Sequence, residues 1–172
     1  LRTTARLDGD HYVLNGQKTF ITSGMRADVI TTAVRTGGPG MGGISLIAVP
    51  GDVPGLARTE LDKMGWWASD TATLYFEDCR VPAKYLLGPE NSGFIGIMQN
   101  FNAERMSIAA MAWAFSKGCL REALAWARQR ETFGKPLIRH QVVRHKLVDM
   151  ATAIRGVEAS LGRLAGFGQR FT

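Results

Sequence analysis

Residues 94–128, FIGIMQNFNAERMSIAAMAWAFSKGCLREALAWAR, are the stretch around which the rest of the chain is organised. At about 100° per residue, six of its side chains fall on one narrow arc of a helix. These six are Ile97, Phe101, Glu104, Ile108, Met111 and Phe115. The pattern predicts a long amphipathic helix with a single carboxylate in its apolar stripe.

Burying an unpaired carboxylate costs several kcal/mol, so we expect Glu104 to find a partner, to stay near water or to raise its pKa. One interpretation pairs it with a cation, either the neighbouring Arg105 or one brought in by the fold. The other makes it a general base whose pKa is moved toward neutrality by desolvation. Periodicity alone leaves both open.

The composition indicates a globular protein. With 172 residues, 45% of them hydrophobic, the chain can bury a core in one large or two small domains. No apolar run reaches the roughly 18 residues of a membrane span, and no signal-peptide layout is present, so a soluble protein is predicted. The chain opens at Leu1, directly in a strand-like pattern, which suggests a piece of a longer protein.

The charge and the cysteine content limit which ligands, metal sites and cellular compartments are expected. The net charge of +6 is moderate and the basic residues are scattered, which favours a phosphate-bearing small molecule over nucleic acid. Cys79 and Cys119 lack CxxC spacing and a histidine cluster. We expect buried free thiols in a reducing compartment and no metal site.

The first half of the chain has the pattern of short strands. Asn15-Gly16 predicts a two-residue hairpin turn between strands at 12–14 and 18–22. Further strands are expected at 29–34, 44–49 and 74–76, separated by turn signals and the glycine-rich residues 37–43. Strands without intervening helices favour an antiparallel barrel or sandwich.

After Gly88-Pro89 the spacing of apolar residues changes from a period of two to a period of 3.6 residues. This change predicts a β domain at 1–88 and a helical domain at 89–172. Residues 132–136 end the first helix. A second helix follows, with its apolar face formed by Val143, Leu147, Met150, Ile154, Val157, Leu161 and Leu164. The predicted fold class is α+β, with the β domain followed by a long antiparallel helical hairpin that forms part of a four-helix bundle.

Five segments, in this order, resemble the acyl-CoA dehydrogenases along essentially the whole chain. They are FITSG (20–24), KMGWWASDTATLYFEDCRVP (63–82), LLGPENSGF (86–94), NFNAERMSIAA (100–110) and RETFGKPLIRHQ (130–141). The resemblance implies an FAD-holding flavoprotein with a helical N-terminal domain, a middle β domain and a C-terminal helical bundle. The chain would cover most of the middle domain and the first two bundle helices, and it is most similar to the long-chain and isovaleryl branch.

In that branch the catalytic glutamate lies on the first bundle helix, where Glu104 matches it. The implied reaction is the FAD-dependent α,β-dehydrogenation of a saturated acyl-CoA to a trans-2-enoyl-CoA. Glu104 takes the α-proton and flavin N5 takes the β-hydride. The alternatives are an acyl-CoA oxidase or flavin monooxygenase of the same superfamily, and a non-catalytic acyl-CoA-binding scaffold.

The resemblance also assigns cofactor contacts. Phe20 and Thr22 match residues that pack against the flavin and hydrogen-bond near its N5 and O4, and Ser23 matches a neighbouring backbone contact. Ordinary strand core is the alternative for Phe20.

A second set of matches lies in the RETFG segment and just after it. Arg130, Thr132 and Phe133 match an element that reaches the FAD of a neighbouring subunit, with Arg130 as a cation for the pyrophosphate. A helix-end cation is the alternative for Arg130. Gln141 resembles a residue near the adenosine end.

Asn102 and Arg105 flank Glu104 and are expected to line the thioester or CoA channel. The implied partners are an acyl-CoA substrate, an electron-transferring flavoprotein as acceptor, and further copies in a homotetramer or dimer. The implied location is the bacterial cytoplasm or the mitochondrial matrix. Because the family builds its pocket from three domains and two subunits, we expect this 172-residue piece alone to bind FAD poorly and to be inactive.

Overall fold

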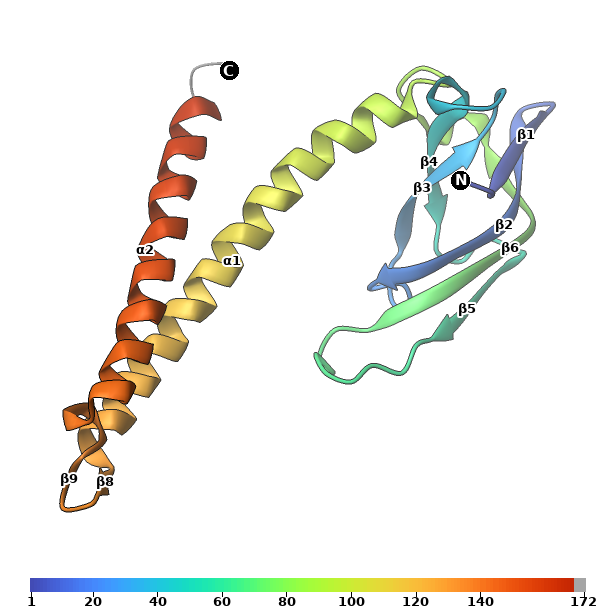
Figure 1. Cartoon of the computed structure of the whole chain (residues 1–172). Coiled ribbons are helices and arrows are strands. Elements are labelled where there is room, and N and C mark those ends of the chain that lie inside the picture. Colours follow the sequence, from blue (N-terminus) through green and yellow to red (C-terminus); the bar gives the residue numbers. More distant parts are fainter. Residues whose placement is uncertain (169–172) are drawn as a thin grey trace. The chain divides into compact units, whose positions relative to one another are not determined.

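The structure, a computed structural model, describes residues 1–168. The chain divides into a β unit, Leu1–Gln99, and a helical unit that begins at Asn100. The strands of the main sheet precede the two long helices in the chain (Figure 1). Within the described residues, neither long helix is apolar enough over a sufficient length to cross a membrane.

The strands of the β unit form one sheet in the order β5-β6-β2-β1-β3-β4-β7. All its pairings are antiparallel except β1 with β3, a parallel pair at Thr4 and Arg35. The observed sheet is therefore mixed, and it departs from the predicted antiparallel arrangement at this one pair. The strands are β1 (Thr4–Asp8), β2 (His11–Thr22), β3 (Val29–Arg35), β4 (Ile44–Pro50), β5 (Leu56–Glu60), β6 (Thr71–Pro82) and β7 (Leu86–Leu87).

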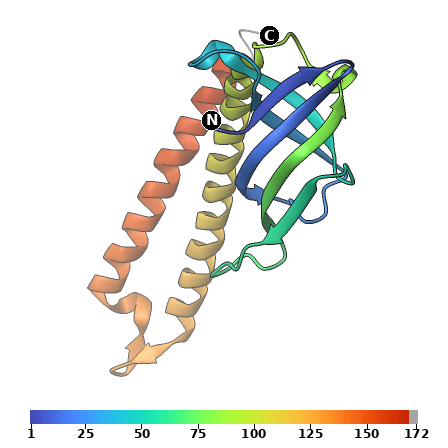
Figure 2. The ribbon, with the colours of Figure 1, turned by 90° about the vertical axis from the view of Figure 1, so that its right-hand side faces the viewer.

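The core of the β unit follows the alternation of side chains along these strands. The long strands β2 and β6 lie side by side in the sheet (Figure 2). Leu14, Ile47 and Leu74 are fully buried and pack with residues from β3 and β4. The 3-10 turns Met41–Gly43 and Ala83–Tyr85 connect strands at the edge of this core.

The hairpin turn predicted at Asn15-Gly16 is wrong, because β2 continues through both residues. Asn15 exchanges two hydrogen bonds with Asp78 of β6, at 2.9 and 3.0 Å. Gly16 has a φ of 134°, and a Cβ there would lie 2.8 Å from the Cα of Thr3. The two residues therefore form a β-bulge, and the chain turns instead at Gly9, between β1 and β2.

The helical unit contains α1 (Gly93–Gln129), from Asn100 onward, and α2 (Gln141–Gly168). The helix predicted over 94–128 is thus confirmed to within one residue at each end. The short strands β8 (Glu131–Thr132) and β9 (Lys135–Pro136) and the 3-10 turn Leu137–Arg139 connect the helices. Leu147 and Ile154 are buried, as the predicted stripe of α2 requires, whereas Val157 and Leu164 are exposed.

The two cysteines are free but differ in burial. Cys79 is buried in the β core, where burial raises the pKa of its thiol. Cys119 is exposed on α1, so the prediction that both thiols are buried is wrong for this residue. Its position on a solvent-facing side of the helix explains the difference.

Lys18 is a lysine on the core side of the sheet. It pairs with Leu74, and paired residues of antiparallel strands project from the same face. Burial lowers the pKa of Lys18 from 10.5 to about 8. Between these two pH values the unfolded chain binds more protons than the folded chain, so stability rises with pH across this window.

We therefore expect Lys18→Met to raise the melting temperature at pH 7, where the buried charge is fully unfavourable. The difference from wild type should shrink as the pH rises from about 8 to about 10.5, since wild-type Lys18 then becomes neutral. Melting curves across this range measure the effect. Lys84→Met, at an exposed lysine, is the matched control, and a Lys18→Met difference that is independent of pH would contradict the prediction.

Candidate functional site

The end of β2 carries an unusual backbone. Phe20 and Ser23 have φ values of 60° and 58°, which residues other than glycine rarely adopt. The ladder with β6 shifts register between Lys18 and Ile21. This irregularity turns Phe20 outward, so that 77% of the residue is exposed and the strand-core interpretation of Phe20 is wrong.

A loop with exposed aromatic residues lies beside this strand end. Lys63 holds the loop through hydrogen bonds from its Nζ to the carbonyl oxygens of Trp66, at 3.2 Å, and Ser69. Trp66 has a φ of 60°, and both Trp66 and Trp67 are largely exposed. The Ser23 amide donates to the Asp70 carbonyl oxygen at 3.0 Å, which joins the loop to the end of β2.

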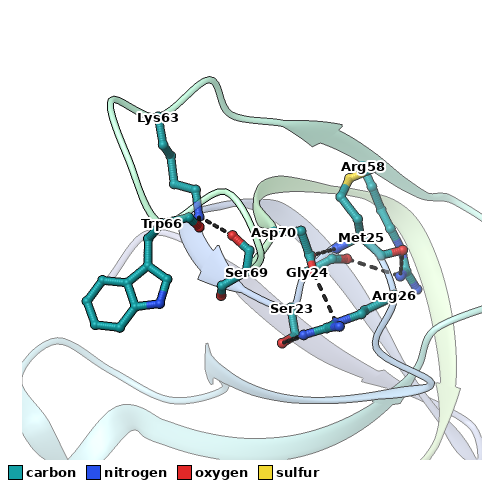
Figure 3. A network of polar contacts seen from close by, with 9 residues as sticks. All are labelled: Ser23, Gly24, Met25, Arg26, Arg58, Lys63, Trp66, Ser69 and Asp70. Atoms are coloured by element: carbon teal, nitrogen blue, oxygen red, sulfur yellow. Dashed lines mark hydrogen bonds and ion pairs between the residues drawn. The ribbon is translucent and has the colours of Figure 1, made fainter. Parts of the chain in front are cut away.

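Arg58 of β5 holds the turn that follows Ser23 (Figure 3). Its guanidinium donates to the carbonyl oxygens of Gly24 (3.0 Å), Met25 (2.9 Å), Ala27 (3.2 Å) and Gly51. These carbonyl groups have no partners within a regular ladder, so the guanidinium fork satisfies them together. The fixed strand end thereby carries two exposed residues, an aromatic one, Phe20, and a hydroxyl-bearing one, Thr22. Such a pair fits a flat heteroaromatic group with polar edge atoms.

Glu104 lies on an exposed face of α1. Its Oε1 accepts a hydrogen bond from Asn100 Nδ2, one turn earlier, at 2.7 Å. The stripe around it is also open, since Phe101 is 40% and Ile108 is 58% exposed. Within the described residues Arg105 is therefore not the partner of Glu104, and the carboxylate stays near water, held by the Asn100 amide.

The uncovered stripe has a physical explanation. Leu120 and Leu124 of α1 line a groove with α2. At 100° per residue they lie about 160° around the helix from Glu104. The second helix therefore packs on the side of α1 away from the acid.

The neighbours of Glu104 along the sequence are not all its neighbours in space. Asn102 lies about 160° around the helix from Glu104 and Arg105 about 100°. Both side chains are exposed. Sequence reasoning missed Asn100, although its i, i+4 spacing to Glu104 is the signal that could have found it.

The turn between α1 and α2 carries Arg130, Thr132 and Phe133, and Gln141 directly follows it. The Leu137 amide donates to the Arg130 carbonyl oxygen at 2.8 Å, which closes the turn. Phe133 has a φ of 51°, is 96% exposed and lies edge-on to the His140 ring, with centroids 6.2 Å apart.

His140 is the residue around which this corner is built. Its Nε2 lies 3.2 Å from Thr132 Oγ1 and 3.3 Å from the Thr132 carbonyl oxygen. Gln141 is the first residue of α2, directly after it. An exposed arginine, Arg130, in the turn that leads to the N-terminus of α2 suits an anionic group.

The acid and the arginine corner are separate places in the helical unit. Glu104 and Gln129, the last residue of α1, are 25 residues apart on one helix, which is roughly 37 Å at 1.5 Å per residue. A single small substrate cannot contact both within one chain. Within residues 1–168, no cluster of three His, Cys, Asp or Glu side chains could hold a metal ion.

Comparison with known proteins gives one consistent result. Residues 1–79 match the family described as acyl-CoA dehydrogenase, middle domain, and residues 91–167 match acyl-CoA dehydrogenase, C-terminal domain. The long-chain specific acyl-CoA dehydrogenase of Sus scrofa mitochondria is 40% identical over 90% of this chain and 37% of its own length.

Solved structures that resemble this chain point to the same family. A probable acyl-CoA dehydrogenase from Mycobacterium abscessus is 55% identical, with a TM-score of 0.91 over 96% of this chain and 46% of that one. A chain from the structure described as the electron transferring flavoprotein of Acidaminococcus fermentans is 38% identical, with a TM-score of 0.91 over 96% of this chain and 44% of that one. The chain thus spans less than half the length of these relatives.

Proposed function

The chain belongs to the acyl-CoA dehydrogenase family, and we propose that the protein that carries it is an FAD-dependent enzyme that introduces an α,β double bond into a saturated acyl-CoA. The observation that supports this most directly is the single carboxylate of Glu104 on an otherwise apolar helix face, held by an amide rather than by a cation. A scaffold that only binds acyl-CoA has no need of such an acid.

Glu104 is the proposed general base. The α-proton of a thioester is a weak acid, so a base must lie within hydrogen-bond reach of it. The Asn100 amide donates to Oε1 and fixes the carboxylate, which leaves Oε2 to take the proton. An acyl chain that lies along Phe101 and Ile108 would present its α-carbon to this oxygen and exclude water from it.

Phe20, Thr22 and Ser23 are the proposed contacts of the flavin ring. The exposed ring of Phe20 offers a stacking surface, and Thr22 offers a hydroxyl that can donate to a ring-edge acceptor. When bound, FAD supplies the hydride acceptor for the β-hydrogen. Asn102 and Arg105 remain proposed contacts of the CoA channel, with Arg105 the closer of the two to the Glu104 side of the helix.

Arg130, Thr132, Phe133 and Gln141 are proposed to hold the pyrophosphate and adenosine part of FAD. The roughly 37 Å between Glu104 and this corner exceeds the reach of one FAD. We therefore propose that the corner serves the FAD of a second copy, which requires a homo-oligomer. This chain alone would then hold FAD poorly, so FAD binding and activity have to be measured on the full-length protein.

The test of the function is anaerobic flavin bleaching by saturated acyl-CoAs of graded chain length. A dehydrogenase should lose its yellow colour with the preferred chain and regain it when electron-transferring flavoprotein, the proposed acceptor, is added. Oxygen consumption with peroxide release would instead identify an oxidase. A protein that binds acyl-CoA without bleaching would be a scaffold, and the proposal would be wrong.

Arg130→Gln should weaken FAD binding by about tenfold to a hundredfold, because a charge-assisted hydrogen bond to phosphate is lost. Titration of the apoprotein with FAD, followed by quenching of flavin fluorescence, measures the change. Arg139→Gln removes another exposed cation of the same corner and is the matched control. Equal losses in both variants would mean that only net charge matters and that Arg130 makes no specific contact.

A further inference from the structure

We propose that Asp70 is a positioning residue for the flavin ring, because it fixes the turn that presents Thr22 and Ser23. The inference rests on the proposed function, since it concerns the geometry of that cofactor site. Asp70 itself is not among the residues assigned to bind FAD. Its role is to hold the backbone of residues that are.

Asp70 binds the turn at three points (Figure 3). Its carboxylate accepts from the Met25 amide at 2.8 Å and from Arg26 Nε at 3.0 Å. Its carbonyl oxygen accepts from the Ser23 amide at 3.0 Å. The Asp70 side chain is only 15% exposed, whereas its partner Arg26 is 66% exposed, so the carboxylate itself is held largely within the protein at the surface end of the turn.

The backbone held in this way is strained. Ser23, with its φ of 58°, and Phe20, with its φ of 60°, occupy a conformation that costs of order 1–3 kcal/mol for such residues. A strained backbone persists only where its surroundings over-determine it. Asp70 supplies that constraint, because three groups of the turn after Thr22 bind to this one residue: the amides of Ser23 and Met25 and Nε of Arg26.

The turn is also held from its other side. Arg58 binds the carbonyl oxygens of Gly24 and Met25, whereas Asp70 binds the amides of Ser23 and Met25. The two residues therefore fix opposite edges of the Gly24–Met25 peptide group, its carbonyl by Arg58 and its amide by Asp70. Of the two, Asp70 is the one that contacts Ser23, and Ser23 directly follows the proposed flavin contact Thr22.

The experiment compares Asp70→Asn with Asp8→Asn in the full-length protein. Asn keeps the shape and can still accept from Met25, but it loses the charge that pairs with Arg26. We expect FAD affinity to fall about tenfold and the visible absorption band of the bound flavin to shift. Asp8 is an exposed acid paired with Arg80, so its variant should leave both readouts unchanged.

The outcomes separate this inference from the function on which it rests. A wild-type protein that takes up no FAD would overturn the proposed function. A folded Asp70→Asn protein with wild-type affinity and an unshifted flavin band would overturn only the positioning role. If Asp70→Asn does not fold, Arg26→Gln decides instead: we expect a two- to fivefold loss of FAD affinity, and an unchanged value overturns the inference.

Discussion

Replacing Glu104 with Gln is expected to slow flavin reduction by acyl-CoA by about 10²–10⁴-fold, the usual contribution of a general base. Gln has the same shape and can still accept the hydrogen bond from Asn100, but it cannot take a proton. Binding of the acyl-CoA should therefore persist while the chemical step is lost. A loss of this kind appears in the rate and not in the affinity.

Anaerobic stopped-flow bleaching measures the rate, and the spectral change on adding acyl-CoA measures binding. Glu122→Gln is the matched control, because Glu122 is another exposed acid on α1. Bleaching of Glu104→Gln at the wild-type rate would show that the base lies elsewhere. Glu104 would then be a structural acid held by Asn100.

Arg58→Ala is expected to destabilise the β unit by about 3–5 kcal/mol. The change leaves the carbonyl oxygens of Gly24, Met25, Ala27 and Gly51 without the guanidinium that binds them. Each unsatisfied group that stays partly buried adds about 1–3 kcal/mol, reduced where water can enter. The loss should spread to the end of β2, since the released turn begins there.

The measurement is the denaturant midpoint, with hydrogen exchange of the β5 and β6 amides to assign the loss to the β unit. Arg80→Ala is the control, because Arg80 forms an exposed ion pair with Asp8 at 2.7 Å. Such a pair contributes about 0–1 kcal/mol. Similar midpoints for the two variants would contradict the role given to Arg58.

Local patterns predicted the helices well. The 3.6-residue period placed α1 to within one residue at each end, because a helix is stabilised by contacts between near neighbours in the sequence. The same reasoning failed at Asn15-Gly16, where the local turn preference competes with pairing to Asp78, 63 residues away. The sequence pattern also does not predict strand β5, because its apolar and polar residues alternate only weakly and its position depends on pairing with β6.

The sequence by itself determined the family and the helical hairpin and singled out Glu104 as the one acid of an apolar stripe, because all three depend on residue types at fixed spacing. Only the tertiary structure decided that Phe20 points outward, that Asn100 holds Glu104, and that Asp70 and Arg58 hold the turn after Ser23. The bulge that exposes Phe20 and the bonds to the turn join residues distant in the chain. Their energies depend on which strands pair and in which register, and no local pattern encodes that choice.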